Sequence, residues 1–292
     1  MITEGYLARH YQGRSGGRDV ALLDVAQDYA IKVLSDAGVF DLGLTLKGGT
    51  ALRKYKVGQG GRFSTDLDFA ANEAGLGELV LSTLDGAALH GVQFSIEVVT
   101  PGRRGRLRIV TPLGNPNVDA LVEIQDRRPW LTPERLNPVR LPVHSKYEFE
   151  PSTIPVMAFV EILAEKLAAF RRRALARDLY DLALFSEGAF DQGLVRKLAY
   201  LKIFIDVVSD GYGSGPFDPS EDILRPRSAS DFQAEDIGLL TTPVDIPGWL
   251  ERVRNRFQFL VETTADERRW SECNHRDLAD VRQIIDSLPV SS

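Results

Sequence analysis

The chain has 292 residues, of which 43% are hydrophobic and 26% charged, with a formal net charge of −6 at pH 7. This composition is ordinary for a soluble globular protein, and no apolar run approaches the roughly 20 residues needed to cross a bilayer. The acidic balance argues against a uniformly basic nucleic-acid-binding surface, although arginine runs occur locally. The polar first residues, the single Cys273 and four scattered histidines argue against secretion, a disulfide and a zinc site. A cytoplasmic protein is expected.

The first predicted elements alternate between helix and strand. Residues 19–37 place apolar side chains at helical spacing and end before Gly38, a suitable helix C-cap. A short apolar strand at residues 42–46 then leads into a Gly-Gly turn, and a helix is expected to begin at Thr50. Residues 66–70 (DLDFA) alternate acidic and apolar side chains, as a half-buried strand does. Further strands are predicted at residues 92–100, 105–113 and 117–127.

The character of the chain changes after a proline-rich connection between Arg127 and Pro155, which is expected to contain a strand. The stretch VMAFVEILAEKLAAFRRR that follows has the pattern of a strong amphipathic helix. Helical patterns then continue to the end of the chain, as in DLYDLALFSEG and LVRKLAYLKIFIDVVSDG. The sequence therefore predicts a first domain of helices and strands over residues 1–150 and a helical domain over residues 151–292.

Asp66 and Asp68 are the residues that point most clearly to a chemistry. Residues i and i+2 of a strand project from the same face, so both carboxylates would point one way while Leu67 and Phe69 point into the core. Two carboxylates so placed repel each other unless a cation lies between them. Mg²⁺ binds through one or two carboxylates plus phosphate oxygens. Taken alone, such a pair is more often part of an exposed acidic strand face than a metal site. The neighbouring residues decide between these two interpretations.

A glycine-containing junction between strand and helix lies just upstream, at Lys47, Gly48, Gly49 and Thr50. Glycine lets the main chain approach a phosphate closely, and a helix N-terminus favours negative charge. A plain tight turn is the alternative. Arg62 and Ser64, directly before the acidic strand, add a cation and a hydroxyl, where an ordinary loop is the alternative.

A third carboxylate is expected from a neighbouring strand. In NVDALVEIQD one face is apolar, and the other carries Asp119, Leu121, Glu123 and Gln125. Glu123 is the predicted third acid and Asp119 the reserve, with a solvent-facing role as the alternative for Glu123. The predicted metal ligands are therefore Asp66, Asp68 and Glu123.

The helical half adds a lysine in EKLAAFRRR and two aspartates in RDLYDL: Lys166, Asp178 and Asp181. Lysine is a usual cation for a triphosphate. On one straight helix Lys166 and Asp181 would lie about 22 Å apart, too far to serve one nucleotide. We therefore expect a break near Arg173–Arg177, with Asp178 capping the next helix. One long helix with solvated charges is the alternative.

The segments LKGGTALRKY, RFSTDLDF, EKLAAFRRR and RDLYDL occur in the order found in the AbiEii/MenT nucleotidyltransferase toxins of bacterial toxin–antitoxin and phage-defence systems. The chain resembles this family over about residues 25–190. The resemblance implies an α+β fold, with a polymerase-β-like nucleotidyltransferase core of mixed sheet and flanking helices, and an appended helical domain. It also implies Mg²⁺-dependent transfer of nucleotides from an NTP, with CTP or UTP as candidates, to the tRNA 3′ acceptor end, which blocks translation. The implied partners are the tRNA acceptor stem and a cognate antitoxin, with no membrane.

The family's motifs further imply residue roles. Asp66 and Asp68 would bind Mg²⁺ and act in catalysis. The triphosphate would lie on the glycine turn beside Ser64, in a nucleotide-binding set of Lys47, Gly48, Gly49, Thr50, Ser64 and Arg171. Lys166 would hold the phosphates with help from Arg171, and Asp181 would be the acidic residue opposite the site.

One departure from the family pattern is the long spacing between Gly49 and Asp66, where the inserted VGQGGRFS is expected to act as a mobile loop. Two rivals remain. The same site could modify a protein or a small molecule, by nucleotide transfer or as a kinase. The second rival is of another class, a non-catalytic interaction module. It is disfavoured by the presence of the glycine turn, both aspartates and Lys166. A Gly-x-Ser-x-Gly elbow and a P-loop are absent from the sequence.

Overall fold

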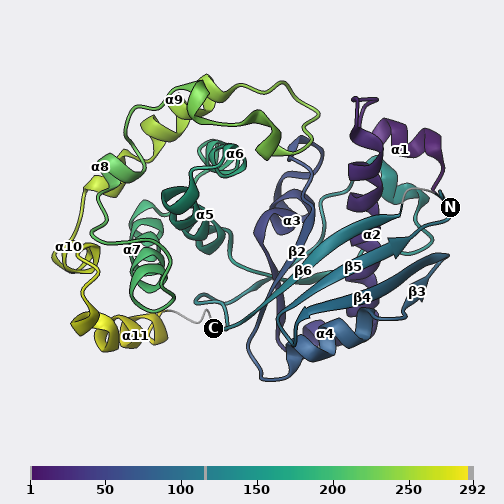
Figure 1. The fold of residues 1–292 in the computed structure, drawn as a ribbon, viewed down its shortest axis with the longest axis horizontal. Coiled ribbons are helices and arrows are strands. Elements are labelled where there is room, and N and C mark those ends of the chain that lie inside the picture. Colours follow the sequence, from purple (N-terminus) through teal and green to yellow (C-terminus); the bar gives the residue numbers. More distant parts are fainter. Residues whose placement is uncertain (1, 115–116, 289–292) are drawn as a thin grey trace. The chain divides into compact units, whose positions relative to one another are not determined.

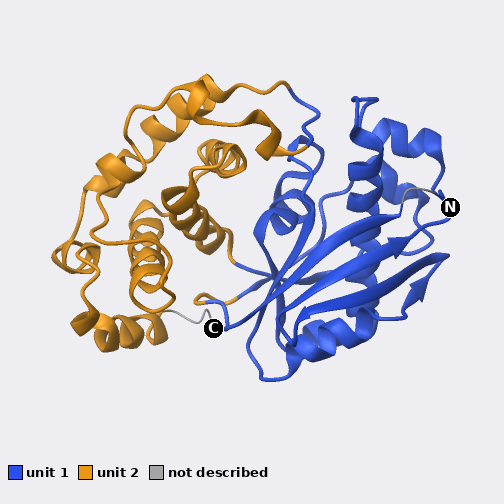
Figure 2. Cartoon of the chain, in the orientation of Figure 1, with its two compact units in different colours: residues 1–129, 133–157, 239–242 blue, residues 130–132, 158–238, 243–292 orange. Residues whose placement is uncertain are grey.

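The computed structural model describes residues 2–114 and 117–288. The chain divides into two compact units (Figure 2). Unit 1 comprises residues 1–129, 133–157 and 239–242, and unit 2 comprises residues 130–132, 158–238 and 243–292. Unit 1 contains the sheet and unit 2 is helical, which confirms the predicted α+β class with a helical C-terminal region. The sheet-containing unit extends to residue 157, beyond the predicted boundary at residue 150.

Unit 1 is built on a mixed sheet whose described strands lie in the order β3-β4-β5-β6-β2-β1-β8-β7. Strands β2 to β6 are labelled in Figure 1. The pairs β2–β6 and β1–β8 are parallel, and the other neighbouring strands are antiparallel. This order places β2 between β6 and β1, in the interior of the sheet. The strands are β1 (Leu44–Lys47), β2 (Asp66–Ala71), β3 (Ala88–Leu89), β4 (Val92–Thr100), β5 (Arg104–Val110), β6 (Val118–Asp126), β7 (Glu134–Leu136) and β8 (Ile154–Val156).

The predicted strands are all present, with small shifts at their ends. β1 begins at Leu44 because the residues before it, Val39–Leu42, form a 3-10 helix and Gly43 has a φ of 98°. β5 ends at Val110, since a turn containing Pro112 follows and proline donates no hydrogen bond to a ladder. The proline-rich connection contributes β7 and β8 to the same sheet.

Two helices cover one face of the sheet. α2 (Gly17–Asp36) and α4 (Leu76–Leu84) contact each other and both pack on β4 and β6 (Figure 1). α2 ends where the sequence predicted, before Gly38 with its φ of 71°. Because β2 alternates between its two faces, Leu67 and Phe69 are buried while Asp66 and Asp68, which alternate with them, are half-buried.

The chain after β1 forms a short helix that is unusually wound. α3 (Gly48–Leu52) starts directly at the strand end, two residues before the predicted start at Thr50, and continues as a π-helix over Arg53–Val57. The next residues, Gly58–Gly60, form a 3-10 turn. This winding points Arg53 and Lys54 into the interior, where both are buried.

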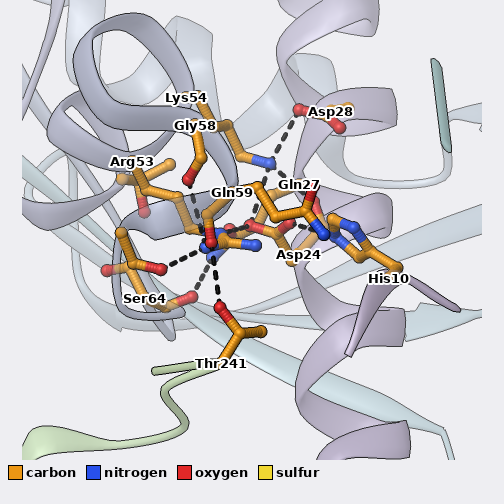
Figure 3. Close-up of polar contacts among 12 residues, drawn as sticks. His10, Asp24, Gln27, Asp28, Arg53, Lys54, Gly58, Gln59, Ser64 and Thr241 are labelled. Atoms are coloured by element: carbon orange, nitrogen blue, oxygen red, sulfur yellow. Dashed lines mark hydrogen bonds and ion pairs between the residues drawn. The ribbon is translucent and has the colours of Figure 1, made fainter. Parts of the chain in front are cut away.

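A buried ionic cluster holds this segment to α2 (Figure 3). Arg53 Nε donates to Asp24 Oδ1 at 2.8 Å, and Lys54 Nζ lies 3.3 Å from the same oxygen. His10 Nε2 lies 2.7 Å from Asp24 Oδ2, and Lys54 Nζ lies 2.7 Å from Asp28 Oδ1. Burial opposes ionisation of Asp24, but Arg53 and Lys54 outweigh it and hold the pKa of this carboxyl well below its ordinary value.

The VGQGGRFS insertion is packed rather than loose, in contrast to the mobile loop expected from the sequence. Arg53 donates to the Gly61 carbonyl, and Phe63 N donates to the Leu239 carbonyl at 3.0 Å. Thr241 Oγ1 donates to the Gln59 carbonyl at 3.1 Å (Figure 3). Buried backbone groups need such partners, and these bonds explain why residues 239–242 belong to unit 1.

Unit 2 is a helical unit around α5 and α7, and Glu161 joins a distant segment to it. The buried Glu161 carboxylate accepts hydrogen bonds from Trp130 N and Leu131 N and from Lys202 Nζ at 2.8 Å, so residues 130–132 belong to this unit. The remaining α-helices of the two units are α1 (Glu4–His10), α5 (Phe159–Arg173), α6 (Ala176–Phe185), α7 (Gln192–Val208), α8 (Pro219–Asp222), α9 (Ile246–Arg256), α10 (Ala265–Ser271) and α11 (Leu278–Asp286). Of the helices described, none has the length and apolar character to cross a membrane.

Candidate functional site

Asp66 and Asp68 project from one face of β2, two residues apart, as the sequence predicted. Asp66 is fixed at the start of the strand. Its backbone carbonyl accepts hydrogen bonds from Thr50 Oγ1 and, at 3.5 Å, from Gln27 Nε2. Its carboxylate oxygen Oδ1 accepts one from Thr65 Oγ1 at 3.2 Å. The strand end that carries the acidic pair is therefore held by α2 and α3.

Gly48 brings the main chain directly against the Asp68 carboxylate. Its φ is +73°, a conformation that side-chain-bearing residues rarely adopt, and a Cβ at this position would lie 2.1 Å from Asp68 Oδ2. Lys47, one residue earlier, is the ladder partner of Asp68 in the β1–β2 pair. Only glycine fits here, and the glycine turn therefore lies directly against Asp68 of the acidic pair.

The second glycine lies against the residues that precede the acidic strand. A Cβ on Gly49 would lie 2.7 Å from Arg62 Nη2 and 3.0 Å from Ser64 Oγ. Both side chains are buried, and the Ser64 carbonyl accepts a hydrogen bond from Gln27 Nε2 at 3.1 Å. The structure thus brings Gly49, Arg62 and Ser64 together beside the turn.

Lys47 and Thr50 use their polar groups within the fold. Lys47 Nζ donates to Gln125 Oε1 at 2.7 Å across the sheet. Thr50 is fully buried, and its hydroxyl donates to the Asp66 carbonyl. Thr50 therefore positions β2 through its hydroxyl.

Glu123 lies beside Asp68 in the parallel β2–β6 ladder, so the two residues share a row and a face. Its carboxylate, however, lies 3.1 Å from Arg104 Nε on β5. The reserve acid, Asp119, lies 3.7 Å from Arg108 Nε. Both acids are thus paired with arginines of the neighbouring strand, which also makes the arginine run of residues 103–108 an ion-paired strand face.

The aspartate pair fits a divalent cation, but the predicted trio is not assembled. Two carboxylates on one face offer the oxygen ligands that Mg²⁺ prefers, with phosphate and water completing its shell. Across residues 2–114 and 117–288, no group of three His, Cys, Asp or Glu side chains is arranged to hold a metal ion. Since Glu123 turns toward Arg104, the fit depends on Asp66 and Asp68.

In unit 2, Lys166 and Asp181 are in direct contact. Lys166 Nζ lies 2.7 Å from Asp181 Oδ2 and 3.7 Å from Asp178 Oδ1. The contact exists because α5 stops at Arg173 and Ala174 adopts a left-handed φ of 43°, which turns the chain into α6. The predicted break is confirmed, and the alternative of one long helix is excluded.

Asp178 does not cap α6, in contrast to the prediction. Leu175 occupies the N-cap position, and Asp178 lies inside the first turn. Its buried carboxylate accepts hydrogen bonds from Arg173 Nε at 2.7 Å and Nη2 at 3.0 Å. The bidentate pair fixes the break by linking the last turn of α5 to the first turn of α6.

Arg171 has a structural role in unit 2. Its Nε donates to Asp222 Oδ2 at 3.0 Å, and its Nη2 donates to the carbonyls of Ser214 and Pro216. These bonds use its Nε and Nη2 groups within unit 2. A nucleotide-binding role for Arg171 stays a prediction from the motif resemblance.

Sequence reasoning missed the buried residues that support the site. Gln27 of α2 donates to the Ser64 and Asp66 carbonyls at the start of β2, and Asp24 accepts a hydrogen bond from Arg53. A signal was present: Asp24, Gln27 and Asp28 are polar residues three and four positions apart, hence on one side of α2, in a stretch that is otherwise mostly apolar. Buried polar groups at such positions need partners.

Comparison with known proteins gives a family and similar solved structures. The model of the family described as nucleotidyl transferase AbiEii toxin, type IV toxin–antitoxin system, matches residues 32–273. MenT4, a nucleotidyltransferase toxin from Mycobacterium tuberculosis H37Rv, is 44% identical over 100% of both chains, with a TM-score of 0.94. Curated proteins give no match.

Two other solved structures are more distant. A candidate nucleotidyltransferase from H. pylori is 21% identical, covering 89% of this chain and 96% of its own, with a TM-score of 0.47. JHP933 from Helicobacter pylori is 20% identical over 99% of both chains, with a TM-score of 0.44. The family match and the full-length 44% identity decide the assignment. The chain belongs to the AbiEii family of nucleotidyltransferase toxins.

Proposed function

We propose that this toxin transfers a nucleotide from a nucleoside triphosphate to the 3′ end of tRNA and thereby blocks translation. One observation carries the proposal: the Gly48 main chain lies against the Asp68 carboxylate, with Asp66 on the same face of β2. A triphosphate on this turn would share divalent cations with both aspartates. The family supports nucleotidyl transfer, and the choice of tRNA follows from the resemblance of the motifs.

The reaction is an in-line displacement. The acceptor hydroxyl oxygen forms a bond to the α-phosphorus, the bond between the α-phosphorus and the bridging oxygen breaks, and pyrophosphate leaves. Asp66 accepts the hydroxyl proton, since Glu123 is paired with Arg104. Bound Mg²⁺ would lower the pKa of the attacking hydroxyl and neutralise charge on the leaving group.

Gly48 and Gly49 act by keeping the main chain free of side chains where phosphate oxygens must approach. The Arg62 guanidinium and the Ser64 hydroxyl, both beside Gly49, are the groups of unit 1 best suited to donate to those oxygens. Lys47, opposite Asp68 in the ladder, adds positive charge to the same row of the sheet. Each of these groups binds or orients, and none forms a covalent bond.

In unit 2, we propose Lys166 as a phosphate-binding group and Asp181 as its partner. An ammonium group has three donors, so Lys166 can hold Asp181 and still donate to a phosphate oxygen. In this arrangement Asp181 is a positioning residue, because it fixes the direction of the lysine head group. The family's motif order supports this assignment.

The experiment that tests the proposal offers each of four α-³²P-labelled NTPs, with Mg²⁺, to total bacterial tRNA and to a tRNA-free lysate. We expect label in tRNA, loss of labelling with EDTA, and recovery with added Mg²⁺. Sequencing of tRNA 3′ ends would identify the nucleotide added. Label found only in protein or in a small molecule would show that the acceptor is not tRNA. The absence of labelling with every NTP would contradict the proposal that the protein is an enzyme.

The type IV toxin–antitoxin description of the family also supports a cognate antitoxin as the protein partner. We propose that such an antitoxin restores translation in cells expressing the toxin. Co-expression of the toxin with a candidate antitoxin, followed by a growth assay and a measurement of translation, tests this directly. Growth arrest that no candidate antitoxin relieves would contradict it.

A further inference from the structure

Unit 2 contains a cavity that is separate from every residue assigned above to phosphate or metal. Its volume is about 720 Å³, and it lies between the loop that follows α8 and the helix α9. Three arginines line it: Arg225 and Arg227 from the loop and Arg254 from α9. Glu251 is its acidic lining residue. A cavity so lined carries a positive charge in a chain whose net charge is −6.

Two of the three guanidinium groups make no polar contact within the described part of the chain. Among the hydrogen bonds and ion pairs of those residues, none involves the side chain of Arg225 or Arg254, and both side chains are exposed. The arginines of the sequence's basic runs behave differently, since Arg104, Arg108 and Arg171 are each paired with a carboxylate. Three arginines that share a cavity with one lining carboxylate, Glu251, leave an excess of positive charge that an anion would neutralise.

The third arginine is held in place. Arg227 Nη2 donates to the Asp222 carbonyl at 2.8 Å, and its guanidinium carbon lies 4.6 Å from the ring centre of the buried Phe170. Burial, and then the nearby charge of Arg225, lower the pKa of Arg227 below its ordinary value. The cavity therefore combines one rigid guanidinium with two exposed ones.

The size and the remaining lining define the ligand. A volume of about 720 Å³ is in the usual range for pockets that take small organic ligands. Ser228, Asn255 and Gln258 add hydroxyl and amide groups to the lining, and Pro226 and Leu250 add apolar contacts. A nucleotide of a nucleic-acid strand, with phosphate, ribose and base, matches this mixture. An aspartate or glutamate side chain of a protein partner would leave most of the volume unfilled.

We propose that this cavity binds the phosphate backbone of an RNA strand, with Arg225 and Arg254 on the phosphates. The proposal rests on the proposed function in taking RNA as the acceptor. An acidic protein needs a local positive site to hold a polyanion, because its average surface repels one. Guanidinium groups suit this role, since each can donate two hydrogen bonds to one phosphate.

The test uses the full chain, without NTP and without Mg²⁺, so that binding is separated from transfer. The probes are fluorescein-labelled total tRNA and a 12-nucleotide single-stranded RNA, followed by anisotropy across a range of salt concentrations. The variant is Arg225→Gln/Arg254→Gln, which leaves Arg227 in place. The matched control is Arg276→Gln/Arg282→Gln, which removes two exposed arginines of the same unit that lie outside the cavity.

We expect the cavity variant to bind both RNAs at least about tenfold more weakly. The slope of log Kd against log salt should fall by about 0.7 for each phosphate that the variant no longer binds. The control variant should bind like the wild type. In transfer assays the cavity variant should show a raised KM for tRNA and an unchanged kcat.

Unchanged RNA affinity and salt dependence in the cavity variant would overturn the proposal. So would unchanged RNA binding accompanied by weaker binding of free NTP or of the cognate antitoxin, which would assign the cavity to those ligands. Failure of the proposed function looks different: the wild type would transfer no nucleotide to tRNA, while RNA binding would still depend on Arg225 and Arg254.

Discussion

Lys166 Nζ lies 2.7 Å from Asp181 Oδ2, although the two residues belong to different helices. The contact joins α5 to α6 across the break at Ala174. A buried ion pair of this kind can serve stability, catalysis or both, and the two roles respond differently to substitution. Replacing each residue alone and then both together separates them.

We predict that Lys166→Ala and Asp181→Asn each lower kcat/KM for the NTP, by about a hundredfold or more for the lysine. If Asp181 acts through Lys166, the double variant should be no worse than Lys166→Ala alone. Steady-state kinetics of the four proteins give the coupling, and thermal unfolding confirms that each is folded. Losses that simply multiply in the double variant would contradict the positioning role of Asp181.

Gly48→Ala should abolish transfer, because its Cβ would lie 2.1 Å from Asp68 Oδ2 and would displace the carboxylate. Gly38→Ala is the matched control, since Gly38 has nearly the same φ, +71° against +73°, and open space around its Cβ position. The control should lose about 1–2 kcal/mol of stability from backbone strain and keep its activity. Equal activity losses in the two variants would show that strain alone is responsible.

The local part of this site could be predicted from the sequence. The alternation in DLDFA fixes which side chains share a face, and the Gly-Gly junction marks the passage from strand to helix, so neighbouring residues decide both features. The break before α6 could also be inferred, because a straight helix would keep Lys166 far from Asp181.

Partners distant in sequence could not be predicted. Glu123 turns to Arg104 of β5, and Arg171 pairs with Asp222, which lies on a later element. A residue pattern gives the face on which a side chain projects but not the group that it will meet there. The Leu175 N-cap shows a related limit, since Asp178 is a good capping residue that instead binds Arg173.

Glu123→Gln should retain most of the transfer activity, in contrast to substitution of the strand aspartates. The Glu123 carboxylate is half-exposed and lies 3.1 Å from Arg104 Nε, so its loss removes an exposed ion pair worth about 1 kcal/mol or less. Titration of activity against Mg²⁺ is the measurement. A large rise in the Mg²⁺ concentration required by Glu123→Gln would restore Glu123 as a metal ligand.

Asp24→Asn should destabilise the protein at pH 7 by about 3–5 kcal/mol, because Arg53 and Lys54 would lose a buried counter-charge. Since the folded-state pKa of Asp24 is depressed, its stabilisation is present above the unfolded pKa of about 3.9 and is lost as the pH falls through the folded value. The stability gap between wild type and variant should therefore narrow below about pH 4.

Urea unfolding of both proteins from pH 7 to pH 3 measures this gap. Asp36→Asn is the control, because the Lys32–Asp36 pair is an exposed i,i+4 pair whose loss should cost less than about 0.5 kcal/mol at any pH. A constant gap between wild type and Asp24→Asn would show that the ionised form of Asp24 is not what stabilises the α3 segment.

The catalytic role of the strand aspartates is tested most directly by single-turnover transfer from α-labelled NTP with Asp66→Asn and Asp68→Asn. Asp41→Asn, which removes an exposed carboxylate paired with Arg135, is the control. We predict a loss of at least about a thousandfold in the rate for each strand aspartate, unchanged thermal unfolding, and wild-type activity in the control. Rates within a few fold of the wild type in folded Asp66→Asn or Asp68→Asn would contradict the assignment of this pair as the metal-binding centre.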